Sequence, residues 1–76
     1  MRTKELRVVA AFETTTAAMA FEAKAKESDI KGRLIPVPRE ITSGCGLSFS
    51  APISEREAVK RMADQMPGIK IYEIII

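Results

Sequence analysis

The residue best suited to covalent chemistry is Cys45, because the 76-residue chain has one cysteine and no histidine. Gly44 and Gly46 flank it, so no adjacent side chain covers the sulfur and backbone amides can approach an anion. Ser43 adds a hydroxyl group. A lone cysteine is most often a small buried hydrophobic residue. These neighbours instead favour an accessible thiol, and the other interpretation is that the two glycines only form a turn or a bulge.

Arg39 is the nearest arginine before the thiol and follows Pro36 and Pro38. The prolines restrict the backbone, which suits a side chain that points at a sulfur, a phosphate or a carboxylate with little entropy left to lose. A nearby arginine, or a helix N-terminus, lowers the pKa of a thiol and increases its thiolate fraction. The commoner role of such an arginine is a solvated loop charge. Thr14 and Thr15 supply further hydroxyls, for which a helix cap is the favoured interpretation.

The missing residue types exclude much other chemistry. One cysteine cannot form a disulfide within the chain, and without histidine neither a Ser–His nor a Cys–His nucleophilic pair exists. A zinc site within one chain would have one thiolate and carboxylates only, which is an unusual ligand set. We therefore expect no metal, no cofactor and no complete enzyme, and we favour a binding or carrier role.

Charge and hydropathy limit the classes of partner and the cellular location that we expect for the protein. Twelve Lys and Arg residues stand against ten Asp and Glu residues, and they are scattered rather than clustered, so we expect no nucleic-acid partner. No apolar run approaches the roughly 20 residues that cross a bilayer, and the first residues lead into no signal-peptide core. We expect a cytoplasmic protein with no membrane partner. The length supports a single domain, residues 1–76.

Hydrophobic patterns predict the element order β-α-β-β-α-β. The predicted strands are 6–12, 33–37, 47–51 and 69–76, and the predicted first helix is 17–26. A capping box, in which Ser54 caps the third helical amide and Glu57 reaches back to the amide of Ser54, predicts the start of the second helix. Pro67 and Gly68 are predicted to stop it. Its core-facing stripe is Val59, Met62, Ala63 and Met66.

This order predicts an α+β ferredoxin-like sandwich. Its four-stranded antiparallel sheet has the order 4-1-3-2, with both helices on one face. The end of the first strand, the start of the first helix and the loop 39–46 then lie at one end of the sheet. We expect Cys45 close to Phe12 and to the Thr14–Thr16 turn, where the positive end of the helix assists the loop.

Several short motifs carry a resemblance to a known family. They are Phe12-Glu13-Thr14-Thr15, Ala18, Glu22, Ile35-Pro36-Val37-Pro38-Arg39 and Ser43-Gly44-Cys45-Gly46-Leu47. In these, and over nearly its whole length, the chain resembles the selenium/sulfur (Se/S) carrier protein-like family of small bacterial proteins. The resemblance implies that Cys45 receives sulfur or selenium and hands it to an acceptor, with Arg39 in the same motif region. The Cys-Pro-x-Pro motif of the sulfurtransferase-relay carriers is missing, so their mechanism does not transfer to this chain.

Three functional hypotheses follow. In the first, Cys45 accepts sulfur or selenium from a cysteine desulfurase-type donor, holds it as a persulfide or selenopersulfide, and passes it to an acceptor protein; loop amides and Arg39 would bind the resulting anion. In the alternative, residues 36–46 form a recognition loop of a small-molecule or protein-binding module without thiol chemistry. In the third, Val9 and Ala11 face away from the helices, and a second copy covers them in a weak homodimer.

Overall fold

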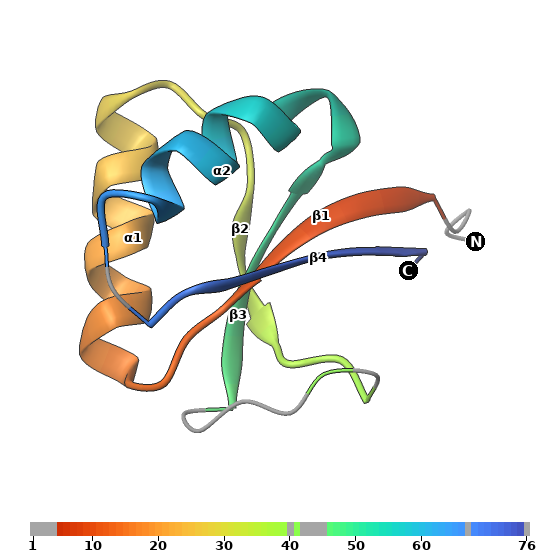
Figure 1. Ribbon diagram of the computed structural model, residues 1–76, viewed down its shortest axis with the longest axis horizontal. Coiled ribbons are helices and arrows are strands. Elements are labelled where there is room, and N and C mark those ends of the chain that lie inside the picture. The colour runs from red at the N-terminus through yellow and green to blue at the C-terminus, as the bar shows by residue number, and fades with distance from the viewer. Residues whose placement is uncertain (1–4, 40, 42–45, 67, 76) are drawn as a thin grey trace.

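The computed structural model describes residues 5–39, 41, 46–66 and 68–75, which form one sheet and a helical layer (Figure 1). The elements are β1 (Leu6–Ala11), α1 (Thr15–Glu27), β2 (Arg33–Pro36), β3 (Leu47–Pro52), the 3-10 turn Ile53–Glu55, α2 (Arg56–Ala63) and β4 (Lys70–Ile75). The sheet order is β2-β3-β1-β4, and each neighbouring pair is antiparallel. This arrangement confirms the predicted α+β ferredoxin-like fold.

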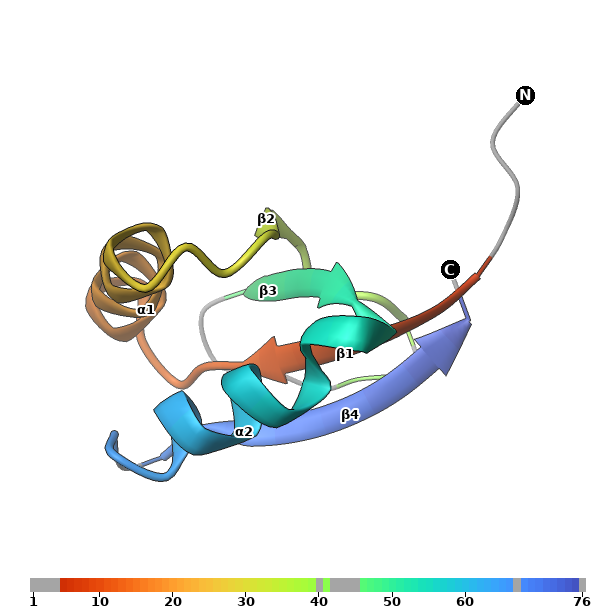
Figure 2. The same ribbon diagram turned by 90° about the horizontal axis from the view of Figure 1, so that it is seen from above.

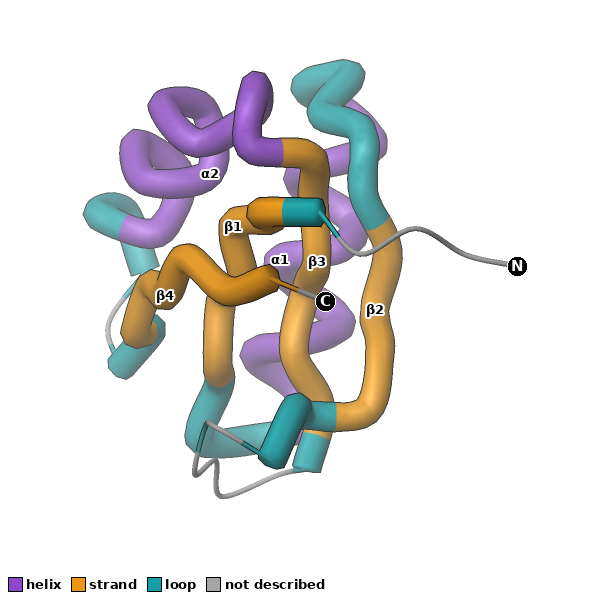
Figure 3. Tube along the Cα trace, turned by 90° about the vertical axis from the view of Figure 1, so that its right-hand side faces the viewer, coloured by secondary structure: helices purple, strands orange, loops and turns teal. Residues whose placement is uncertain are grey.

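The main core lies between the sheet and the helices, which share one face of the sheet (Figure 3). Helix α1 packs against β3 and β2, and α2 packs against β1, β3 and β4 (Figure 2). Phe21 of α1 stands at the centre, with its ring centroid 5.3 Å from that of Phe12 and 5.1 Å from that of Phe49. Val8 and Ala10 of β1 contribute to the same core from the sheet. They lie two residues apart, so their side chains point to the same face of the strand.

Helix α1 has a defined cap at each end. The Thr14 hydroxyl accepts a hydrogen bond from the amide of Ala17 (3.1 Å), so the helix starts two residues before the predicted Ala17. At its other end Asp29 has a positive φ of 58°, and the amide of Ile30 donates to the carbonyl of Ala25 (2.8 Å). This is a Schellman motif, which stops the helix and turns Ile30 back towards it.

The start of α2 corrects the predicted capping box. Ser54 lies inside the 3-10 turn Ile53–Glu55 rather than at the N-cap, and Glu55 occupies the N-cap without a side-chain hydrogen bond. Pro52, with φ fixed at −58°, leads the chain straight from β3 into this tighter turn. The amides of the first helical turn therefore do not receive the two reciprocal side-chain bonds of a capping box.

The end of α2 also differs from the prediction. The helix ends at Ala63, before the predicted Pro67 and Gly68, because the following amides bond three residues back: Gln65 to Met62 (3.1 Å) and Met66 to Ala63 (3.1 Å). Met66 nevertheless packs against the main core, as its place in the predicted stripe required.

An ion pair ties α2 to the edge strand β4. The Arg56 guanidinium donates to the Glu73 carboxylate at 3.1 Å, and a second carboxylate, that of Glu57, lies 3.5 Å away. The hydrogen bond to Glu73, together with the negative charge of that carboxylate, raises the pKa of Arg56 above its ordinary value. The pair is exposed to solvent, so it links the first residue of α2 to β4 but contributes little to stability.

Candidate functional site

The candidate site is the connection between β2 and β3, which contains the only cysteine of the chain. Pro36 and Leu47 form the last ladder pair, and just beyond them the amide of Val37 donates to the carbonyl of Gly46 at 3.0 Å. The two ends of the connection are thus hydrogen-bonded to each other. The predicted site residues Ser43, Gly44 and Cys45 lie outside the described residues.

Gly46 leaves its side of the connection open. Its φ of +75° is in the left-handed region that favours glycine, and a Cβ atom added there would have no neighbouring atom within 4 Å. The residue is exposed. A ligand or a partner protein can therefore approach the backbone immediately after Cys45 in the sequence.

Ile41 anchors the same connection to the sheet. Its side chain is only 4% exposed and packs with Val9 and Ala11, on the face of the sheet opposite the helices. Val37, Tyr72 and Ile74 complete this second cluster. The amide of Ile41 donates to the carbonyl of Pro38 (3.0 Å), which makes a tight turn around Arg39. The apolar face that we expected a second copy to cover is therefore covered in part by the chain itself.

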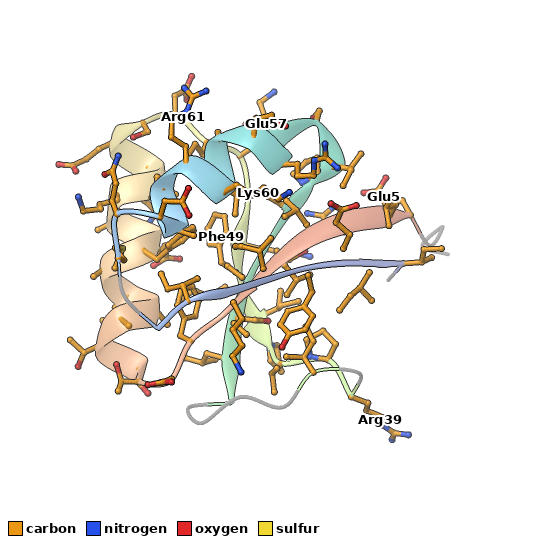
Figure 4. All side chains as sticks on the ribbon, in the orientation of Figure 1. Glu5, Arg39, Phe49, Glu57, Lys60 and Arg61 are labelled. Carbon is orange, nitrogen blue, oxygen red and sulfur yellow. The ribbon has the colours of Figure 1, made fainter. Side chains whose placement is uncertain are left out.

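Arg39 is at the outer edge of this turn. Its side chain extends away from the sheet into solvent (Figure 4). It forms no ion pair with any residue in the described part of the chain. The geometry of this conformation is that of a solvated charge, and the guanidinium remains available to an anion that arrives from solution.

Thr14 and Thr15 lie at the same end of the sheet as the candidate site. Ladder pairing places Ala11, at the end of β1, opposite Ser48, at the start of β3, and α1 begins a few residues after Ala11 (Figure 1). The sequence predicts that the end of the first strand, the start of the first helix and the loop before the third strand lie at one end of the sheet. The described residues of these segments confirm this. The Thr14 hydroxyl serves as the helix cap, as favoured, and Thr15 is an exposed first-turn residue.

The first turn of α1 contributes electrostatics rather than a specific contact. No acidic side chain lies in it, but the exposed Glu13 stands directly before the N-cap Thr14. The partial positive charge of the helix N-terminus favours an anion within about one turn of Thr15. The predicted proximity of Cys45 to Phe12 and to the Thr14–Thr16 turn falls outside the described residues.

Sequence reasoning missed three residues under the connection. Ile41 was assigned to a polar loop, although it is the one branched apolar residue of that loop, and this contrast could have marked it as an anchor. Ser48 and Ser50 alternate with the apolar residues of β3, a pattern typical of a strand with one polar face in solvent, yet both are buried, at 0% and 3% exposure. Ser50 accepts a hydrogen bond from the Nε of Arg7 (2.7 Å), whereas the Ser48 hydroxyl has no partner among the described residues.

The described residues hold neither a metal-binding cluster nor a membrane-spanning helix. They contain no group of three or more side chains that could hold a metal ion. Within the same residues, no helix is long and apolar enough to cross a membrane. The described residues place an exposed glycine, a solvated arginine and the N-terminus of α1 at one end of the sheet, and no contact among the described residues joins these three features.

Comparison with known proteins identifies the family. No curated protein and no solved structure matches the chain. One family model does match, and its match covers residues 7–76, that is, all helices and strands except the first residue of β1, with the β2–β3 connection included. The chain therefore belongs to the family described as "Putative Se/S carrier protein-like".

Proposed function

We propose that the protein is a sulfur or selenium carrier that uses Cys45 as its acceptor atom. The Cys45 thiolate attacks the terminal sulfur or selenium of a persulfide or selenopersulfide on a cysteine desulfurase-type donor. The new bond to Cys45 forms as the donor's bond to that atom breaks, and the donor thiolate leaves with the electron pair. An acceptor nucleophile then takes the terminal atom, and the Cys45 thiolate leaves in turn. No oxidant or reductant is consumed.

The observation that carries this proposal is the family match, which spans the segment with the only thiol of the chain. Physical features at the same end of the sheet support it. The backbone at Gly46 is open to an approaching partner, and α1 directs its positive end there without an acidic residue in its first turn. The first feature gives a partner access to the chain next to Cys45, and the second favours an anion near the start of α1. The exposed Arg39 supplies a cation to the same anion.

Intact-mass spectrometry tests the proposal. The protein is incubated with a cysteine desulfurase and either cysteine or selenocysteine, and we expect a mass increase equal to one sulfur or one selenium atom. The Cys45→Ser variant should show no increase. A relocated thiol, Ser54→Cys in the Cys45→Ser background, is the matched control, because Ser54 is exposed on the far side of the fold.

The relocated thiol separates a dedicated site from ordinary thiol reactivity. We expect it to load at least tenfold more slowly than Cys45. Equal loading of both thiols, or an unmodified native protein, would refute the carrier proposal.

A binding module without thiol chemistry is the second candidate, and the anchoring of the connection favours it. Val37 and Ile41 are packed against the sheet, so the turn between them presents Arg39 in a defined place. Under this hypothesis Cys45→Ser leaves partner binding unchanged, and Arg39→Ala abolishes it. Under the carrier hypothesis Cys45→Ser abolishes loading, and Arg39→Ala reduces its rate.

A further inference from the structure

A groove lies where the C-terminal end of α1 meets α2, far from the β2–β3 connection. It encloses about 350 Å³ and is half open to solvent. Helix α1 has 13 residues, so its two ends are about 20 Å apart. The candidate site lies at the N-terminal end of α1 and the groove at the other (Figure 1). An occupant of the groove would leave the β2–β3 connection uncovered.

The walls of the groove combine an apolar floor with a charged rim. Met62 and Ile30 supply the floor; Met62 is 7% exposed, and the Schellman motif at the end of α1 holds Ile30 in place. Lys24 of α1 and Arg61 of α2 stand on the rim, with Glu27 as its one acidic side chain. Figure 4 shows Arg61 projecting outward from α2 on the side where α1 ends.

The two basic side chains on the rim are unpaired. The ion pairs of the described residues involve Arg7 and Arg56, and neither Lys24 nor Arg61 takes part in one. Two positive charges against one negative charge leave the lining with a net positive charge. A carboxylate bound in the groove would therefore meet two basic lining side chains that take part in no ion pair among the described residues.

We propose that this groove binds a short acidic peptide segment of a partner protein. One apolar side chain of the segment packs on Met62 and Ile30, and a neighbouring Asp or Glu lies between Lys24 and Arg61. A peptide fits better than a small molecule, because small-molecule sites bury most of their ligand whereas this groove is half open. The proposal does not depend on thiol chemistry at Cys45.

A peptide-display selection tests the proposal. Random twelve-residue peptides are selected on the native protein and counter-selected on the Lys24→Glu/Arg61→Glu double variant. We expect the survivors to be enriched in Asp or Glu beside an apolar residue. The affinity of a selected peptide should fall at least tenfold with either single charge reversal. It should change less than twofold with Lys26→Glu, which reverses an exposed charge of the same helical turn outside the groove.

Nuclear magnetic resonance provides the second readout. Addition of a selected peptide should shift the amide signals of Ile30, Arg61 and Met62 more than those of β2 and β3. Each of the following overturns the proposal: no enrichment over the counter-selection, survivors without acidic residues, an equal loss of affinity in Lys26→Glu, or shifts centred elsewhere. Octanoate competing with a selected peptide at micromolar concentration would assign the groove to a small carboxylate instead.

Discussion

Ser48 places a hydroxyl group inside the protein, and within residues 5–39, 41, 46–66 and 68–75 this hydroxyl has no hydrogen-bond partner. The residue is 0% exposed, and β-strand pairing holds it between Ala11 and Ile35 on the face that carries the Ile41 cluster. An unpaired buried polar group costs about 1–3 kcal/mol. The hydroxyl therefore lowers the stability of the segment immediately after Cys45.

Replacing this serine should stabilise the protein. We predict that Ser48→Ala raises the free energy of unfolding by about 1 kcal/mol, because it removes the desolvated hydroxyl and leaves the strand intact. Urea denaturation followed by circular dichroism measures the change. Ser50→Ala is the matched control and should lower stability, because it removes the partner of the Arg7 Nε. An equal loss of stability in both variants would contradict the account of Ser48.

At the scale of elements, Gly32, the residue directly before β2, lies very close to β3. A Cβ atom at Gly32 would lie 2.6 Å from the Phe49 ring and 2.7 Å from the carbonyl oxygen of Ser50. The ring belongs to the buried aromatic cluster and the carbonyl to the sheet backbone, so neither can move aside cheaply.

We predict that Gly32→Ala lowers the free energy of unfolding by about 1–3 kcal/mol through overpacking of the core, in addition to backbone strain at its φ of +155°. Gly46→Ala is the comparison, since its Cβ would meet open space and only the left-handed backbone is penalised, by about 1–2 kcal/mol. Thermal unfolding of the two variants gives the measurement. A variant at Gly32 as stable as the native protein would show that Phe49 can move.

The sequence predicted the strands and the sheet order well because those signals are local and periodic. Alternation along β1 correctly assigned Val8 and Val9 to opposite faces. The start of α2 was wrong, because a motif such as that of Ser54 and Glu57 does not reveal that a 3-10 turn precedes the helix. Ile41 was also missed, since its burial depends on contacts with β1 that are distant in the sequence.

At the scale of the whole molecule, the sheet is packed on both faces. The helices cover one face, and the start of the β2–β3 connection covers part of the other through Val37 and Ile41 (Figure 3). Val37 and Ile41 of the connection therefore belong to the second hydrophobic cluster and pack against the sheet. Stability and the geometry of the site are coupled through Ile41.

We predict that Ile41→Ala lowers the free energy of unfolding by about 2–4 kcal/mol, because it removes a buried side chain from the second cluster. Ile75→Ala is the matched control; its side chain is 61% exposed, and the change should stay within about 0.5 kcal/mol. Chemical denaturation measures both. Equal stability of the two variants would mean that Ile41 does not anchor the connection.

The weak homodimer stays a prediction. Tyr72 and Ile74 remain partly exposed on the face opposite the helices, beside the residues that Ile41 covers. Sedimentation equilibrium should show a mass that increases with concentration above that of one chain. A constant mass of a single chain at high concentration would contradict the prediction.

Transfer of a sulfur atom through Cys45, as proposed, is tested most directly by a pulse-and-chase measurement with radiolabelled sulfur. The protein is loaded from labelled cysteine by a cysteine desulfurase, repurified and exposed to an excess of an unlabelled thiol acceptor. We predict that the label lies on the peptide that contains Cys45 and leaves quantitatively with the acceptor. Label elsewhere in the chain, or label on Cys45 that no thiol acceptor can remove, would contradict the carrier function.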